Sequence, residues 1–151
     1  MLTVKGSAKI LDFGLAQTAA STKLTRMGST LGTVAYMSPE QARGEEVDLR
    51  TDLWSLGVIM YEMISGRIPF RAEYDTAAIY LIMQQDPEPL TAVRTGVPME
   101  LERIVFKLLT KESSLRYQSS KDLLIDLDRL DLSSLSNRGT IANGFTRHLA
   151  T

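Results

Sequence analysis

Three residues near the start of the chain have types that suit metal binding. Asp12, Phe13 and Gly14 directly follow residues 8–11, an apolar stretch typical of a short strand. A carboxylate at the end of a strand can bind a divalent cation, and a glycine lets the backbone turn sharply after it. The same tripeptide is equally typical of an ordinary β-turn, with aspartate in first place and glycine closing it. Taken alone, it therefore assigns no function.

Further polar motifs follow downstream. Residues 32–40 read Gly-Thr-Val-Ala-Tyr-Met-Ser-Pro-Glu, residues 52–57 read Asp-Leu-Trp-Ser-Leu-Gly, and Arg116 comes last. Glu40 and Asp52 each stand in the first turn of an expected helix, where the helix dipole favours a carboxylate. Stabilisation of a helix start is thus enough to explain each acid by itself. The evidence about function lies in the order of the four motifs, which are residues 12–14, residues 32–40, residues 52–57 and Arg116.

The elements that must position these residues are mostly helical. Residues 1–11 suit two short strands around a turn, and residues 17–32 suit a loop. Apolar spacing and end signals predict helices at 38–44, 51–65, 75–85, from Pro98 onward, and 119–130. The helix over 51–65 is apolar nearly all round, so we expect it to be buried on most sides. The last helix is expected to turn four leucines inward, Leu123, Leu124, Leu127 and Leu130. The fold class is therefore mainly α with a short β-hairpin.

Composition excludes several classes of protein. The 151 residues are enough for one domain, and 17 Lys and Arg against 18 Asp and Glu remove the usual charge argument for a nucleic-acid-binding surface. Without cysteine, and with one histidine, the chain has no thiolate nucleophile and no His-based metal site or triad. The longest apolar run, residues 53–64, contains Glu62 and is shorter than the about 20 residues of a membrane span. We expect a cytoplasmic protein with no nucleic-acid partner and no membrane segment.

The four motifs, in this order, resemble the C-terminal lobe of a serine/threonine protein kinase of the bacterial, eukaryotic-like type. D-F-G and A-P-E are protein-kinase signatures, and here the second reads Ser-Pro-Glu at residues 38–40. The resemblance implies a partial kinase domain over 1–130, with an activation segment over about 12–40 and a helical lobe over about 38–130. Residues 131–151 are rich in Ser, Asn and Gly, and we expect a disordered tail or linker there.

The resemblance also implies roles for residues of the activation segment. Asp12 would hold Mg²⁺ across the phosphates of ATP, and Phe13 and Gly14 would complete this cofactor-binding motif. Thr33 would face the substrate, which implies a Ser/Thr acceptor; the alternative is a threonine that caps a neighbouring amide. Three hydroxyls are candidates for a regulatory phosphate, and each fits a solvated loop equally well: Thr22, Thr25 and Thr30.

Three residues outside the phosphate site would have structural roles. Glu40 and Arg116 resemble the buried ion pair that joins the end of the activation segment to the helical core. Asp52 would accept hydrogen bonds from the backbone of the catalytic loop. The loop itself, of the form H-R-D-x-x-x-x-N, does not occur in the sequence, nor do the glycine-rich loop and the strand lysine.

Because these motifs are missing, two interpretations of the sequence are possible. In the first, the chain is a fragment of a serine/threonine kinase that transfers the γ-phosphate of ATP to protein hydroxyls. The catalytic base then lies upstream of Met1, the partners are a protein substrate and the missing N-terminal half, and the chain alone is inactive. In the second, it is a non-catalytic, kinase-like module that binds a protein. The intact D-F-G favours the first, because a binding module has no chemical need for a metal ligand.

Overall fold

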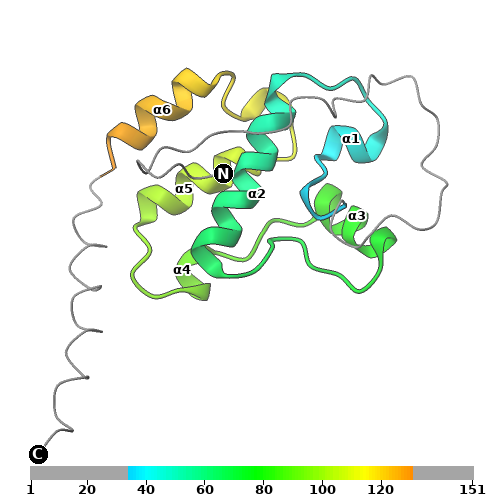
Figure 1. Ribbon diagram of the computed structural model, residues 1–151, viewed down its shortest axis with the longest axis horizontal. Helices are drawn as coiled ribbons and strands as arrows, with labels where there is room; N and C mark the ends of the chain where they lie inside the picture. Colours follow the sequence, from blue (N-terminus) through cyan, green and yellow to red (C-terminus); the bar gives the residue numbers. More distant parts are fainter. Residues whose placement is uncertain (1–33, 131–151) are drawn as a thin grey trace, which may run out of the picture.

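A computed structural model describes residues 34–130, and all regular structure in that range is helical (Figure 1). The elements in order are η1 (Val34–Tyr36), α1 (Pro39–Arg43), α2 (Leu49–Ser65), α3 (Asp75–Gln84), α4 (Leu90–Val93), α5 (Met99–Leu108), η2 (Ser113–Leu115) and α6 (Ser120–Asp128). The mainly helical class is confirmed for this range. The expected β-hairpin at 1–11 and the expected tail at 131–151 lie outside the described residues.

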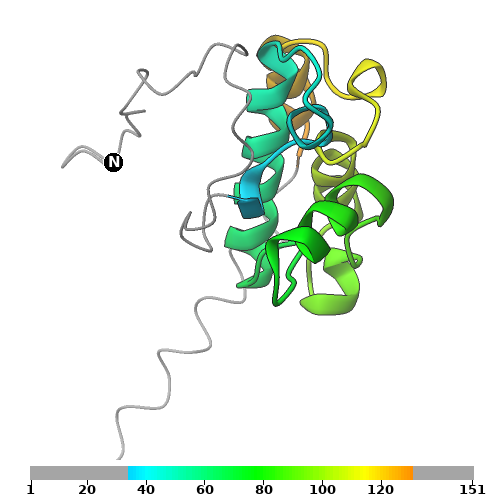
Figure 2. The ribbon, with the colours of Figure 1, turned by 90° about the vertical axis from the view of Figure 1, so that its right-hand side faces the viewer.

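The long helix α2 organises the fold. It begins after Asp48, whose carboxylate accepts a hydrogen bond from the Arg50 amide at 2.8 Å. It ends at Gly66, where φ is 78°, a left-handed conformation that glycine adopts without steric cost. Figures 1 and 2 show α2 running through the molecule with α3, α4 and α5 packed on one side of it.

Two apolar clusters cover the packed side of α2. The larger joins α2 to η1, α3, α4 and α5 through Val34, Trp54, Val58, Tyr61, Phe70, Ala78, Ile82, Leu90, Val105 and Leu109. The smaller joins α2 to α5 and α6 through Leu53, Ile104, Leu108, Tyr117 and Leu123. Because α2 supplies residues to both clusters, it fixes the relative positions of α3, α4, α5 and α6.

The expectation that α2 is buried on most sides is wrong for one face. Leu56, Ile59 and Met63 are 38%, 43% and 76% exposed, and they follow Asp52 along one stripe of the helix. Leu124 is also 56% exposed rather than inward. In both cases the described part of the chain does not bury these apolar side chains, and periodicity alone cannot show whether a covering segment exists.

Gly57 marks the closest approach of α2 to α5. A Cβ atom at Gly57 would lie 2.7 Å from Cβ of Leu108 and 3.1 Å from Cδ2 of Leu109. We expect Gly57→Ala to lower the free energy of unfolding by about 1–3 kcal/mol, since the helices must move apart. Urea unfolding followed by circular dichroism measures this change. Met63→Ala, on the exposed stripe of the same helix, should change stability by less than about 0.5 kcal/mol. A stabilised Gly57→Ala chain would show that helix propensity outweighs the crowding.

Candidate functional site

The segment from Ser38 to Gly44 forms a short, well-capped helix. The Ser38 hydroxyl accepts a hydrogen bond from the Gln41 amide at 3.3 Å, and the Gln41 side chain accepts one from the Ser38 amide at 2.9 Å. Pro39 occupies the first helical position, and Gly44 closes the helix with φ of 70°. This reciprocal capping places Glu40 in the first turn of α1, facing the core rather than solvent.

Glu40 and Arg116, which are 76 residues apart in the sequence, form a two-pronged ion pair. The two guanidinium nitrogens donate to the two carboxylate oxygens at 2.7 Å and 2.6 Å. Glu40 is 6% exposed and Arg116 is 2% exposed, so the pair is almost fully removed from water. The Thr51 hydroxyl of α2 donates to the same carboxylate at 2.7 Å. The sequence analysis paired the two charged residues but did not identify Thr51.

Every N–H group of the Arg116 guanidinium has an acceptor. Besides the two bonds to Glu40, its nitrogens donate to three backbone carbonyls, those of Thr110 at 2.7 Å, Lys111 at 3.0 Å and Arg50 at 3.2 Å. A guanidinium has five N–H groups, so no donor remains for a ligand. Arg116 therefore joins α1, α2 and the segment after α5, and it does not form an open anion site.

The surroundings of Glu40 set its protonation state. Burial alone would raise the pKa of Glu40, but hydrogen bonds from Arg116, the Glu40 backbone and Thr51, with the guanidinium charge, lower it to about 2. The carboxylate is therefore ionised throughout the neutral range. A charge held in this way stabilises the fold only while its partner is present.

A stack of aromatic rings and cations adjoins the ion pair. The indole of Trp54 lies against the ring of Phe70, with centroids 5.7 Å apart and planes 8° from parallel. The Arg116 guanidinium carbon lies 5.1 Å from the Trp54 centroid, and the Lys111 ammonium nitrogen lies 3.9 Å from the Phe70 centroid. Trp54 is fully buried in the larger apolar cluster. Its contact with Arg116 extends the ion pair into the core.

A second connection holds η1 against α2. The Tyr36 hydroxyl donates to the Glu62 carboxylate at 2.6 Å, and the Ser55 hydroxyl donates to the Tyr36 carbonyl at 3.3 Å. The hydrogen bond with Glu62, partial burial and the carboxylate charge raise the pKa of Tyr36. The sequence analysis did not pair Tyr36 with Glu62, although an acid inside an apolar run is a signal for such a buried partner.

Of the remaining candidate residues, only Asp52 lies in the described part of the chain. Asp52 lies in the first turn of α2 with an exposed side chain. The other candidates lie outside the described residues: Asp12, Phe13, Gly14, Thr22, Thr25, Thr30 and Thr33. Among residues 34–130, no group of three or more acids and histidines is placed to hold a metal ion.

Two hollows open on the described surface. A small one of about 100 Å³ lies beside η1 and the start of α3, and its wall includes Val34, Ala35, Phe70 and Tyr74. A larger one of about 480 Å³ lies between the end of α5 and the connection from α3 to α4. No helix in the described range is long and apolar enough to cross a membrane.

Comparison with known proteins gives consistent results. The sequence model for "Protein kinase domain" matches residues 1–124. Serine/threonine-protein kinase PknB of Mycobacterium leprae is 37% identical over 131 residues, which are 86% of this chain and 21% of that protein. A probable serine/threonine-protein kinase of Clostridium perfringens is 33% identical over 130 residues, 86% of this chain and 19% of that protein. The chain thus spans about a fifth of the length of these curated relatives.

The fold also has a counterpart among solved structures. The twitchin kinase region from C. elegans superimposes with a TM-score of 0.56 at 28% sequence identity. The match covers 66% of this chain and 17% of that one.

Proposed function

The chain belongs to the protein kinase domain family, and from this we propose that it is the helical C-terminal part of a bacterial serine/threonine protein kinase. The observation that carries the proposal is the buried, fully paired contact between Glu40 and Arg116. It attaches the Ser-Pro-Glu end of the proposed activation segment to the helical core. In this proposal the intact kinase transfers the γ-phosphate of ATP to Ser and Thr hydroxyls of a protein substrate.

The chemistry requires positioning and charge neutralisation more than covalent assistance. The acceptor oxygen bonds to the γ-phosphorus as the bond to the ADP oxygen breaks, and the hydroxyl proton passes to a base. Mg²⁺, when bound, offsets the charge on the phosphates. We propose Asp12, with Phe13 and Gly14, as the group that holds this ion, and Thr33 as the residue that faces the substrate. The regulatory phosphate is proposed for Thr22, Thr25 or Thr30.

The proposed substrate-facing residue adjoins a rigid support. Val34 and Ala35, the next residues along the chain, are buried, and Tyr36 is bonded to α2 through Glu62 and Ser55. A reacting hydroxyl must be placed within a few tenths of an ångström, so a firm support beside it favours transfer.

The exposed stripe of α2 supports the partial-domain proposal. Leu56, Ile59 and Met63 present an apolar face, with the Asp52 carboxylate at its end. Among residues 34–130 this stripe is left exposed, and an exposed apolar stripe on a central helix favours packing against another part of the domain. We propose that this part is the N-terminal half of the kinase, which carries the catalytic base, and that Asp52 accepts hydrogen bonds from its backbone.

The second candidate function is a non-catalytic module that binds a partner protein. The same α2 stripe favours it, because an exposed apolar face is a common docking surface. Under this hypothesis, substitution of Met63 or Ile59 would weaken partner binding and Asp12→Ala would have no effect.

A phosphotransfer assay distinguishes the kinase-fragment proposal from the binding-module hypothesis. We expect the 151-residue chain alone to show no ATP- and Mg²⁺-dependent phosphorylation of an acceptor protein above that of Asp12→Ala. The reason is that this sequence contains no H-R-D base. Joined to a segment that supplies this loop, the same chain should phosphorylate, and Asp12→Ala should then reduce the rate at least about 100-fold. Activity of the chain alone that Asp12→Ala abolishes would contradict the proposed inactivity.

The mass of the protein as made in its source cells gives an independent test. Its intact mass, measured after isolation from its source cells, should be well above the 16.8 kDa of this chain and include an upstream H-R-D motif. A product of 16.8 kDa that begins at Met1 would contradict the kinase-fragment proposal and favour the binding module.

A further inference from the structure

Lys111 has an unusual environment among the described lysines. It follows α5, and its side chain turns back so that Nζ lies 3.9 Å from the Phe70 centroid and 5.1 Å from the Trp54 centroid. Its one hydrogen bond in the described range is a long one, 3.4 Å, to the Leu81 carbonyl. Lys107 and Lys121 are exposed by comparison. Lys111 therefore has two ring faces and one carbonyl in place of most of its water.

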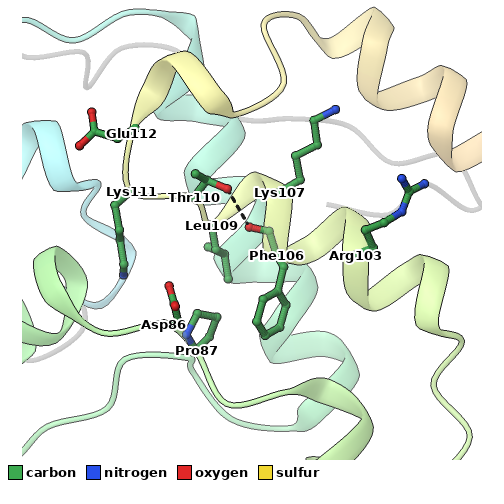
Figure 3. Close-up of a pocket in the computed structure, with 9 residues that line it drawn as sticks. All are labelled: Asp86, Pro87, Arg103, Phe106, Lys107, Leu109, Thr110, Lys111 and Glu112. Atoms are coloured by element: carbon green, nitrogen blue, oxygen red, sulfur yellow. Dashed lines mark hydrogen bonds between the residues drawn. The ribbon is translucent and has the colours of Figure 1, made fainter.

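The side chain of Lys111 forms part of the wall of the larger pocket. This pocket of about 480 Å³ is also lined by Asp86, Pro87, Phe106 and Thr110. Figure 3 shows the Lys111 amine directed toward Asp86, whereas the head groups of Arg103 and Lys107 are directed away from it at the rim. No ion pair within 4.0 Å joins Lys111 to an acid in the described range. Lys111 therefore forms part of the wall of an open space that admits a small molecule, and its amine is directed toward Asp86 of the same wall.

Burial is the main reason that the environment of Lys111 favours its neutral form. Burial lowers the pKa of Lys111 to about 8, the Asp86 carboxylate opposes this shift, and the Arg116 guanidinium adds to it. Glu112 also lines the pocket, next in sequence to Lys111, and Glu40 is fully engaged by Arg116. With this pKa, about a tenth of Lys111 is the free amine at pH 7, and the free amine is the nucleophilic form.

We propose that Lys111 is an acylation site, at which the amine attacks a small acyl phosphate that enters the pocket. The nitrogen bonds to the carbonyl carbon, the bond from that carbon to the phosphate oxygen breaks, and inorganic phosphate leaves. The proton lost by the nitrogen goes to the departing phosphate, so charge and atoms balance. The lining includes the cations of Arg103 and Lys107, whose long side chains can rotate toward an anionic donor, and the carboxylates of Asp86 and Glu112, which repel it.

Acetyl phosphate is the probe for a direct test. The 151-residue chain is incubated with it at pH 7.5, and acetylation of each lysine is followed over time by peptide mass spectrometry. At this pH about a quarter of Lys111 is unprotonated, against about one in a thousand for an ordinary lysine. A less basic nucleophile is also a weaker one, so we expect Lys111 to react about 10-fold faster than Lys107 and Lys121.

The controls identify the folded pocket as the cause. In urea at unfolding concentrations the advantage of Lys111 should disappear. The Lys111 rate should level off above about pH 8, while that of Lys121 continues to rise. Asp86→Asn, at an exposed position, removes a carboxylate that favours the ammonium and repels the donor, so it should raise the Lys111 rate about 2- to 3-fold. A Lys111 rate no faster than that of Lys121, or unchanged or lower in Asp86→Asn, would overturn the proposal.

Discussion

Replacement of Arg116 by alanine is expected to lower the free energy of unfolding by about 3–5 kcal/mol. The substitution leaves the buried Glu40 carboxylate with the Thr51 hydroxyl and the Glu40 backbone as its only donors, and it leaves three backbone carbonyls without a side-chain donor. A loss of this size is a large fraction of the stability of a small domain. Urea unfolding of the 151-residue chain at pH 7, followed by circular dichroism, measures it.

Two further variants distinguish the contribution of the charge at position 116 from that of the two-pronged contact with Glu40. Arg116→Lys keeps the charge but cannot make the two-pronged contact, so its loss should be smaller than that of Arg116→Ala but still above 1 kcal/mol or so. Glu40→Gln combined with Arg116→Met removes both charges, and it should be more stable than Arg116→Ala. If the double variant is the less stable, the cost lies in lost packing rather than in an unpaired charge.

The stability lost in Arg116→Ala should become smaller as the pH is lowered. The folded-state pKa of Glu40, about 2, is below the 4.5 of a free glutamate. The resulting stabilisation is complete above the unfolded pKa and is lost as the pH falls through the folded one. The difference in stability between the native chain and Arg116→Ala should therefore narrow as the pH is lowered from 7 toward 3. A difference that stays constant would contradict an ionic origin.

Replacement of Trp54 by alanine is expected to cost about 3–5 kcal/mol as well, for a different reason. Trp54 is fully buried, it stacks on Phe70, and its face meets the cations of Arg116 and Lys111. Removal of the indole leaves a cavity beside both. Because Trp54 is the only tryptophan in the chain, unfolding of the variant is followed by far-ultraviolet circular dichroism rather than by fluorescence.

Trp54→Phe is the matched control. Phenylalanine keeps a ring for the stack and removes the indole Nε1, which has no hydrogen-bond partner in the described part of the chain. We therefore expect it to cost about 1–2 kcal/mol, well below the alanine variant. Equal losses for the two variants would show that an interaction specific to the indole, rather than buried volume, dominates.

Local signals predicted most of the described helices well. Ser38, Gln41 and Gly44 indicated both ends of α1, because capping depends only on residues a few positions apart. The start of α5 was predicted within a residue, and Leu101, Ile104, Val105 and Leu108 on its apolar stripe do face the core. The start of α2 was placed two residues late, since Asp48 was not recognised as its N-cap. The short helix α4 was missed because its four residues carry too little periodicity.

Burial was predicted less well than helicity. The exposed stripe belongs to α2, whose apolar residues nearly encircle it, and the exposed Leu124 belongs to α6, next to the buried Leu123. Periodicity identifies which residues can be buried, but another segment must be present to bury them. The contacts of Thr51, Tyr36 and Lys111 were missed for a related reason, because each depends on an element distant in sequence.

The sequence by itself determined the family, the helical class and the order of motifs, because these depend on residue types and short spacings. The comparisons confirm the family, and they leave the roles of Asp12 and Thr33 as proposals. Only the tertiary structure decided how Arg116 divides its five donors among Glu40 and three carbonyls, and how Lys111 comes to lie beside both Phe70 and a pocket. Such environments arise because the packing of α2 against α5 brings together segments that are far apart in the sequence. No local sequence pattern encodes these contacts.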